Sequence, residues 1–171
     1  MDRRREAILQ TEVAQKPNVG LAHFLTVATN QEINLMNVER IIEVGVAVKD
    51  LDMATKVYSD ILGAKVGVTM NVDMYKMRFR YCRLGNVDFE LMEPTAEKGV
   101  IADFIKRRGE GLHHIALKVT NLKESLSFMK QKGVSLIDEV PRHLSGDDNN
   151  GSFAFIHPSS FHGVLFELIE H

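Results

Sequence analysis

Apolar and polar positions alternate in two short stretches of the chain, residues 43–50 and residues 112–119. Each stretch has an aliphatic side chain at every second position, which is typical of a strand with one buried face. Successive side chains of a strand point to opposite faces, so Glu43 and His114 lie on the face opposite these aliphatic residues, and His113 is expected to face away from His114. Aligning Glu43 with His114 also aligns the aliphatic positions, so the pattern is repeated within the chain.

A second pair of strands repeats more clearly. Residues 87–93 read VDFELME, and residues 164–170 read VLFELIE. Each copy holds one central glutamate, Glu90 or Glu167, between apolar neighbours. The two repeats together indicate an internal duplication. This duplication gives equivalent positions to four polar residues, Glu43, Glu90, His114 and Glu167.

The periodic patterns predict the element order β-α-β-β-β in a first module, residues 38–94. Asp50 is expected to cap its helix, and Gly63 to end it. At helical spacing, the buried face of this helix is expected to carry Ala54, Val57, Tyr58, Ile61 and Leu62. Three strands are then expected, at residues 64–70, 76–83 and 87–92.

The same order is predicted for a second module, residues 109–171. Asn121 is expected to cap a helix that ends at Gly133. Its expected inward positions are Leu122, Ser125, Leu126 and Met129. Strands are then expected at residues 134–138, 152–156 and 163–169.

These patterns predict an α+β fold in which the two tandem modules form one curved mixed sheet around a metal-binding cleft. Residues 94–108 join the modules through a short helix. Residues 1–37 lie outside the duplication and are expected to form a partly helical N-terminal extension to the domain at residues 38–171. The loop at residues 141–151 is rich in Asp, Asn and Gly, and we expect it to be mobile and close to the site.

Composition narrows the functional classes. The chain has 171 residues, 44% of them hydrophobic, and a formal net charge of −2, which gives no electrostatic case for nucleic-acid binding. No apolar run approaches the ~18 residues of a membrane span. A single cysteine, Cys82, excludes an internal disulfide and a cysteine-rich zinc site. The N-terminus has arginines but no apolar signal-peptide core, so a cytoplasmic location is expected.

The four equivalent polar residues predict a metal site. A buried carboxylate without a partner costs several kcal/mol or shifts its pKa, and three together repel one another. A divalent cation removes this difficulty. One imidazole and three carboxylates suit Mg²⁺, Mn²⁺, Co²⁺, Ni²⁺ or Zn²⁺. For a single strand glutamate, a solvated position is the commoner situation, so the hypothesis rests on the equivalence of all four.

Other polar residues lack this support. The remaining histidines are interpreted as loop residues or as neighbours of the ligands, and they are His113, His143, His157 and His162. A basic stripe, Arg78, Arg80 and Arg83, is interpreted as a solvated face, with anion contact as the alternative.

Several segments carry a resemblance to a known group of proteins. They are residues 44–51, 60–63, 84–94, 108–116, 133–138 and 155–168. With the paired modules, these segments resemble the vicinal oxygen chelate superfamily, which includes glyoxalase and bleomycin-resistance proteins. Within it, the chain is most similar to the methylmalonyl-CoA epimerase family. It departs from that family at Glu43, where the pattern has His, at Ser159, where it has Lys, and around Phe79, where no second acid–base carboxylate is found.

The resemblance implies a metal-dependent epimerase of a 2-substituted malonyl-CoA, acting by α-proton abstraction with a metal-stabilised enolate. It implies Glu43, Glu90, His114 and Glu167 as ligands of a divalent ion, and Glu167 also as the base. An acyl-CoA substrate and a homodimer are the implied partners, with no nucleic acid and no membrane. Two alternatives stay open: a glyoxalase-like lyase or isomerase of a smaller substrate, and a non-catalytic binding protein of the same fold.

Overall fold

The computed structural model describes residues 36–143 and 151–171. Residues 1–35, expected to form most of the N-terminal extension, lie outside the described residues, and so do residues 144–150 of the loop expected to be mobile. The part of the chain described below is the compact unit Met36–His171.

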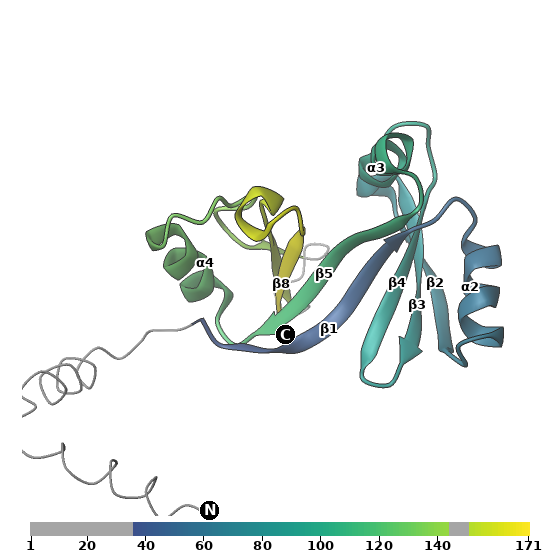
Figure 1. Ribbon diagram of the computed structural model, residues 1–171, viewed down its shortest axis with the longest axis horizontal. Helices are drawn as coiled ribbons and strands as arrows, with labels where there is room; N and C mark the ends of the chain where they lie inside the picture. Colours follow the sequence, from purple (N-terminus) through teal and green to yellow (C-terminus); the bar gives the residue numbers. More distant parts are fainter. Residues whose placement is uncertain (1–35, 144–150) are drawn as a thin grey trace, which may run out of the picture. The chain divides into compact units, whose positions relative to one another are not determined.

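A single mixed sheet of eight strands organises this unit, in the order β2-β3-β4-β1-β5-β8-β7-β6. The first module supplies β1 (Val38–Ala47), β2 (Lys65–Val72), β3 (Met77–Leu84) and β4 (Val87–Pro94). The second supplies β5 (Gly111–Val119), β6 (Arg142–His143), β7 (Ser152–Ile156) and β8 (Phe166–Glu170). The first strands of the modules, β1 and β5, pair antiparallel at the centre, and each runs parallel to the last strand of its own module. The predicted α+β fold with a curved mixed sheet is confirmed (Figure 1).

Three α-helices accompany the sheet in the described residues: α2 (Leu51–Asp60), α3 (Val100–Arg108) and α4 (Leu122–Gln131). Both predicted N-caps are confirmed, because Asp50 accepts a hydrogen bond from the amide of Met53 and Asn121 from that of Glu124. Helix α2 lies on the outer side of β2, β3 and β4, and α4 lies outside β8 (Figure 1). None of the helices in the described part of the chain is long and apolar enough to cross a membrane.

The core is divided between the two sides of the sheet. Outward-facing residues such as Leu91 and Cys82 pack under α2, and Leu168 and Ile156 pack under α4. The inward positions predicted for the second helix are all buried. A third cluster, centred on Ile101 of α3, packs on the opposite face of the sheet. Helices α2 and α4 cover the outer face and α3 covers only part of the inner face, which leaves the remainder of the inner face of the central strands for polar side chains.

Two sequence-based predictions are wrong in detail. In the first helix Leu51 and Thr55 are buried, whereas Val57, Ile61 and Leu62 are exposed. The helix ends at Asp60, so Ile61 and Leu62 lie beyond it and do not extend its buried face.

The strand predicted at residues 134–138 is also wrong, since this segment makes only an isolated bridge between Leu136 and Ile156. The Asp138 carboxylate accepts a hydrogen bond from the Phe155 amide at 2.9 Å, in place of a backbone carbonyl. The ladder is interrupted there, and the short strand β6 pairs with β7 instead.

Candidate metal centre

The four residues singled out from the sequence come together on the inner face of the sheet. Glu43, Glu90, His114 and Glu167 lie on β1, β4, β5 and β8, which are the four central strands. Nε2 of His114 is 3.1 Å from Glu167 Oε2, 3.3 Å from Glu43 Oε1 and 3.8 Å from Glu90 Oε2. All four residues are buried. One imidazole nitrogen therefore faces three carboxylates.

Strand register explains this convergence. Gly45 is the pairing partner of both Glu90 and His114, while Ala116 pairs with both Glu43 and Glu167. Paired residues of neighbouring strands direct their side chains to the same face. Glycine and alanine at the pairing positions leave room in the middle for the four longer side chains.

Two irregularities in the β1–β5 ladder flank the site. The register shifts between Ile41 and Glu43, and again between Gly45 and Val46. At the second shift Gly45 pairs with His114 but Val46 pairs with Leu112, which leaves His113 as an extra residue in β5. Such a bulge re-aims a side chain. The prediction that His113 faces away from His114 is wrong, because Nδ1 of His113 lies 3.0 Å from Nδ1 of His114.

Burial and mutual repulsion raise the pKa of two carboxyl groups at the site, Glu90 and Glu167. Burial raises the pKa of Glu90 well above its ordinary value, and the charge on Glu43 adds to this. Burial also raises the pKa of Glu167, although hydrogen bonding to His114 opposes it. For His114 burial acts to lower the pKa, but hydrogen bonds to Glu167 and Glu43 outweigh it and raise the pKa to about 10. Without a metal ion the imidazole is therefore a cation.

This donor set fits a divalent cation. Ligand atoms of Glu43, Glu90 and His114 all lie within 4.8 Å of one another, and Glu167 contacts the same imidazole nitrogen. A protonated His114 compensates only one of the three carboxylate charges. A divalent ion would take the place of that proton and compensate two, with nitrogen and oxygen ligands that suit Mn²⁺, Co²⁺ or Zn²⁺. The ligand role of each of the four side chains stays a prediction.

Sequence reasoning missed two aromatic residues beside this cluster. Tyr81 on β3 pairs with Glu90, and its ring packs against Phe79 at 5.2 Å. Burial raises the pKa of Tyr81, and the charges of Glu43 and Glu90 and a hydrogen bond to Glu43 raise it further, so its hydroxyl stays neutral. Phe155 on β7 pairs with Glu167 and meets the His114 ring edge to face at 5.7 Å. The sequence pattern could have identified both residues, because Tyr81 on β3 and Phe155 on β7 alternate with residues that face outward.

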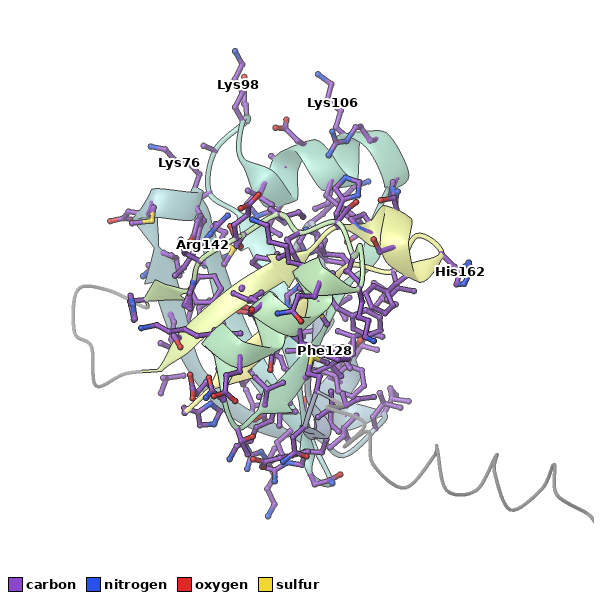
Figure 2. All side chains as sticks on the ribbon, turned by 90° about the vertical axis from the view of Figure 1, so that its left-hand side faces the viewer. Lys76, Lys98, Lys106, Phe128, Arg142 and His162 are labelled. Carbon is purple, nitrogen blue, oxygen red and sulfur yellow. The ribbon has the colours of Figure 1, made fainter. Side chains whose placement is uncertain are left out.

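Other histidines and arginines considered from the sequence lie away from the four-residue cluster or form ion pairs. His157 caps the short helix η2 (Pro158–Phe161), and His162 ends it at the molecular surface (Figure 2). The three arginines of the predicted basic stripe each pair with an acidic side chain: Glu93, Asp52 and Asp88. The Arg142 guanidinium, labelled in Figure 2, is held by Asp138 at 2.8 Å from its Nε.

Comparisons with known proteins agree with this fold. The family model described as the glyoxalase/bleomycin resistance protein/dioxygenase superfamily matches residues 43–155. The chain belongs to this superfamily.

Individual relatives indicate which enzymes of this superfamily the chain resembles. The chain is 34% identical to the uncharacterized Bacillus subtilis protein YqjC, over 77% of this chain and 91% of that protein. It is 32% identical to the methylmalonyl-CoA epimerase of Bos taurus, over 77% of this chain and 74% of that protein. A solved methylmalonyl-CoA epimerase in complex with methylmalonyl-CoA and NH4+ superposes with a TM-score of 0.70 at 28% identity, over 78% of this chain and 95% of that one. The chain is thus related to enzymes of the isomerase class.

Proposed function

We propose that the protein is a metal-dependent epimerase of a 2-substituted malonyl-CoA, of the methylmalonyl-CoA kind. The observation that carries this proposal is the convergence of three buried carboxylates on Nε2 of His114, at 3.1 to 3.8 Å. This arrangement suits a cation centre, and the named epimerases are the relatives that support the substrate class.

The chemistry requires a base next to the acidic carbon of the substrate. When bound, a divalent cation would supply Lewis-acid stabilisation of the negative charge that develops on the thioester oxygen. Glu167 is the residue we assign to remove the α-proton, or to return it, on one face of the enolate, and inversion at this carbon requires a second acid to exchange the proton on the opposite face. Burial raises its pKa, which makes its carboxylate a stronger base than an exposed glutamate.

Tyr81 supplies a second polar group at the site. In the strand order it lies on β3, whereas Glu167 lies on β8, so the two residues approach the cluster from opposite sides. Its neutral hydroxyl is a hydrogen-bond donor. We assign Tyr81 to orient the Glu43 carboxylate, to which its hydroxyl donates, while Glu167 handles the proton.

An acyl-CoA substrate also needs cations for its phosphate groups. Lys76, Lys98 and Lys106 are exposed, and the ends of their side chains project into solvent around α3 (Figure 2). Gly99 lies against the Cβ atom of Lys76, so the first two lysines belong to neighbouring segments. We assign these three lysines as the contacts for the nucleotide phosphates.

A homodimer is the assembly we propose. Met53, Val57 and Ile61 are 64%, 52% and 76% exposed along the outer side of α2 and just beyond its end. The equivalent positions of the second module hold Glu124, the partly buried Phe128 and Lys132, so that surface is more polar. The larger exposed apolar surface of the first helix supports a contact there with a second copy of the chain.

The test is interconversion of the methylmalonyl-CoA epimers by the full chain, loaded with Mn²⁺ or Co²⁺ and again after chelation. We expect metal-dependent turnover. The hemithioacetal of methylglyoxal and glutathione serves as the competing substrate, for the glyoxalase-like alternative. Turnover of the hemithioacetal alone would overturn the proposed substrate class, and binding of both compounds without turnover would favour the non-catalytic alternative.

A further inference from the structure

The His113 side chain contacts the His114 ring of the candidate metal centre at Nδ1, the nitrogen that does not face the three carboxylates. As the extra residue of a bulge in β5, it does not follow the strict alternation of the strand. Its Nδ1 therefore comes within 3.0 Å of Nδ1 of His114, although the two residues are adjacent in sequence. The two rings are nearly perpendicular, at 87°.

The two nitrogens of His114 have different surroundings. Nε2 faces the carboxylates of Glu43, Glu90 and Glu167, whereas Nδ1 faces His113. An imidazole that binds a metal ion is neutral, and it carries its proton on the nitrogen that does not bind. The partner of that N–H group normally fixes the tautomer and the orientation of the ring.

We propose that His113 is a positioning residue: its Nδ1 accepts a hydrogen bond from Nδ1–H of His114 and so keeps Nε2 of His114 free to bind a divalent cation. This inference rests on the proposed metal centre. The opposite direction, with His113 donating, would place the proton of a neutral His114 on Nε2. That tautomer would present a proton to the carboxylates and have no lone pair for a cation.

The surroundings of His113 suit this role. Its ring is partly buried and meets Phe104 of α3 edge to face at 4.9 Å. The Arg108 guanidinium lies 5.9 Å from the centre of the Phe104 ring. Helix α3 therefore holds the His113 ring in place. A neutral imidazole has one ring nitrogen with a lone pair that can accept a hydrogen bond.

The tautomer can be observed directly in the full-length wild-type protein. Long-range proton–nitrogen correlation spectra of the Zn²⁺-loaded, ¹⁵N-labelled protein distinguish protonated, unprotonated and metal-bound ring nitrogens. We expect His114 to have a proton on Nδ1 and zinc on Nε2, and His113 to have its proton on Nε2. A His114 ring bound to zinc through Nδ1, or a His113 ring protonated on Nδ1, would overturn the proposal.

Two substitutions separate positioning from packing. His113→Asn retains an acceptor oxygen close to the position of Nδ1, whereas His113→Leu keeps apolar bulk against Phe104 but has no acceptor. We expect His113→Leu to lower Zn²⁺ affinity about 10–100-fold, the usual cost of losing such a partner, and His113→Asn to recover most of it. Thermal unfolding of the metal-free variants controls for folding.

The outcomes also separate this inference from the metal centre itself. Wild-type protein that binds no Zn²⁺ would remove the metal centre and this inference with it. Wild-type protein that binds Zn²⁺ no more tightly than His113→Leu would overturn the role of His113 and leave the metal centre standing. If His113→Leu fails to fold, the wild-type spectrum still decides the direction of the hydrogen bond.

Discussion

The imidazole of His114 lies directly against the α-carbon of Gly45, its pairing partner on the neighbouring strand. A β-carbon built on Gly45 would lie 2.2 Å from Cε1 and 2.3 Å from Nδ1 of His114. No real side chain tolerates this approach, so the ring occupies the space that any other residue at position 45 would fill. The absence of a side chain at Gly45 is what allows His114 to reach the three carboxylates.

Gly45→Ala is therefore expected to displace the His114 ring and impair metal binding. We expect affinity for Zn²⁺ to fall by more than the about 10–100-fold that follows loss of an outer hydrogen-bond partner. Crowding in the core is expected to destabilise the protein by about 1–3 kcal/mol. Isothermal titration with Zn²⁺ and chemical denaturation measure the two effects.

Gly67→Ala is the matched control, because a β-carbon there would make only ordinary contacts with Tyr81, the nearest at 3.4 Å. It is expected to retain wild-type Zn²⁺ affinity. Equal affinity of the Gly45 and Gly67 variants would contradict the account of the ring position.

The metal-free protein is expected to lose stability as pH rises. Despite its burial, His114 has its pKa raised from 6.5 to about 10 by hydrogen bonds to Glu167 and Glu43. A pKa that folding raises gives a stabilising contribution that is complete below pH 6.5 and lost as pH rises through 10. The raised pKa of Glu167 acts in the same direction. Denaturant unfolding of chelated protein across this range measures the effect, and His114→Gln should reduce the slope. A free energy of unfolding that rises with pH would contradict the assignment.

Metal binding is expected to release the proton held by His114. At pH 8 the metal-free imidazole is charged, because its pKa is raised to about 10, whereas a ligating imidazole is neutral. About one proton per bound ion should therefore be released. Calorimetric titration with Zn²⁺ in buffers of different ionisation enthalpy counts it. Release of no proton at pH 8 would mean that His114 is not a ligand.

The two equivalent helix caps should contribute to stability without affecting the site. Asp50 caps α2 and Asn121 caps α4, each by accepting a hydrogen bond from an amide three residues later. Asp50→Ala and Asn121→Ala should each lower the free energy of unfolding by about 1 kcal/mol. Zn²⁺ affinity should not change in either variant. A loss of affinity in one of them would show that its helix supports the metal centre.

Much of the fold could be predicted because the duplication gives each pattern twice. Repeated alternation located the paired strands, and the repeated glutamate identified Glu90 and Glu167. The position of His113 could not be predicted, because a bulge depends on how two strands pair and leaves no period of its own. The absence of the strand expected at residues 134–138 could not be predicted for a similar reason. The Asp138 carboxylate accepts a hydrogen bond from the backbone amide of Phe155 on β7. This is a tertiary contact that local propensity does not encode.

The most direct test of the central claim is solvent deuterium exchange into C2 of methylmalonyl-CoA, measured by mass spectrometry alongside bound metal. The metal-loaded wild type should exchange C2, and chelation should abolish the exchange. Glu167→Gln should keep much of its metal while exchange slows about 10²–10⁴-fold, the usual contribution of a positioned acid–base group. Glu90→Gln should be milder, since Glu90 is assigned only as a ligand. Equal, small losses in the two variants, or no exchange in metal-loaded wild type, would contradict the assignment of Glu167 as the base of a metal-dependent epimerase.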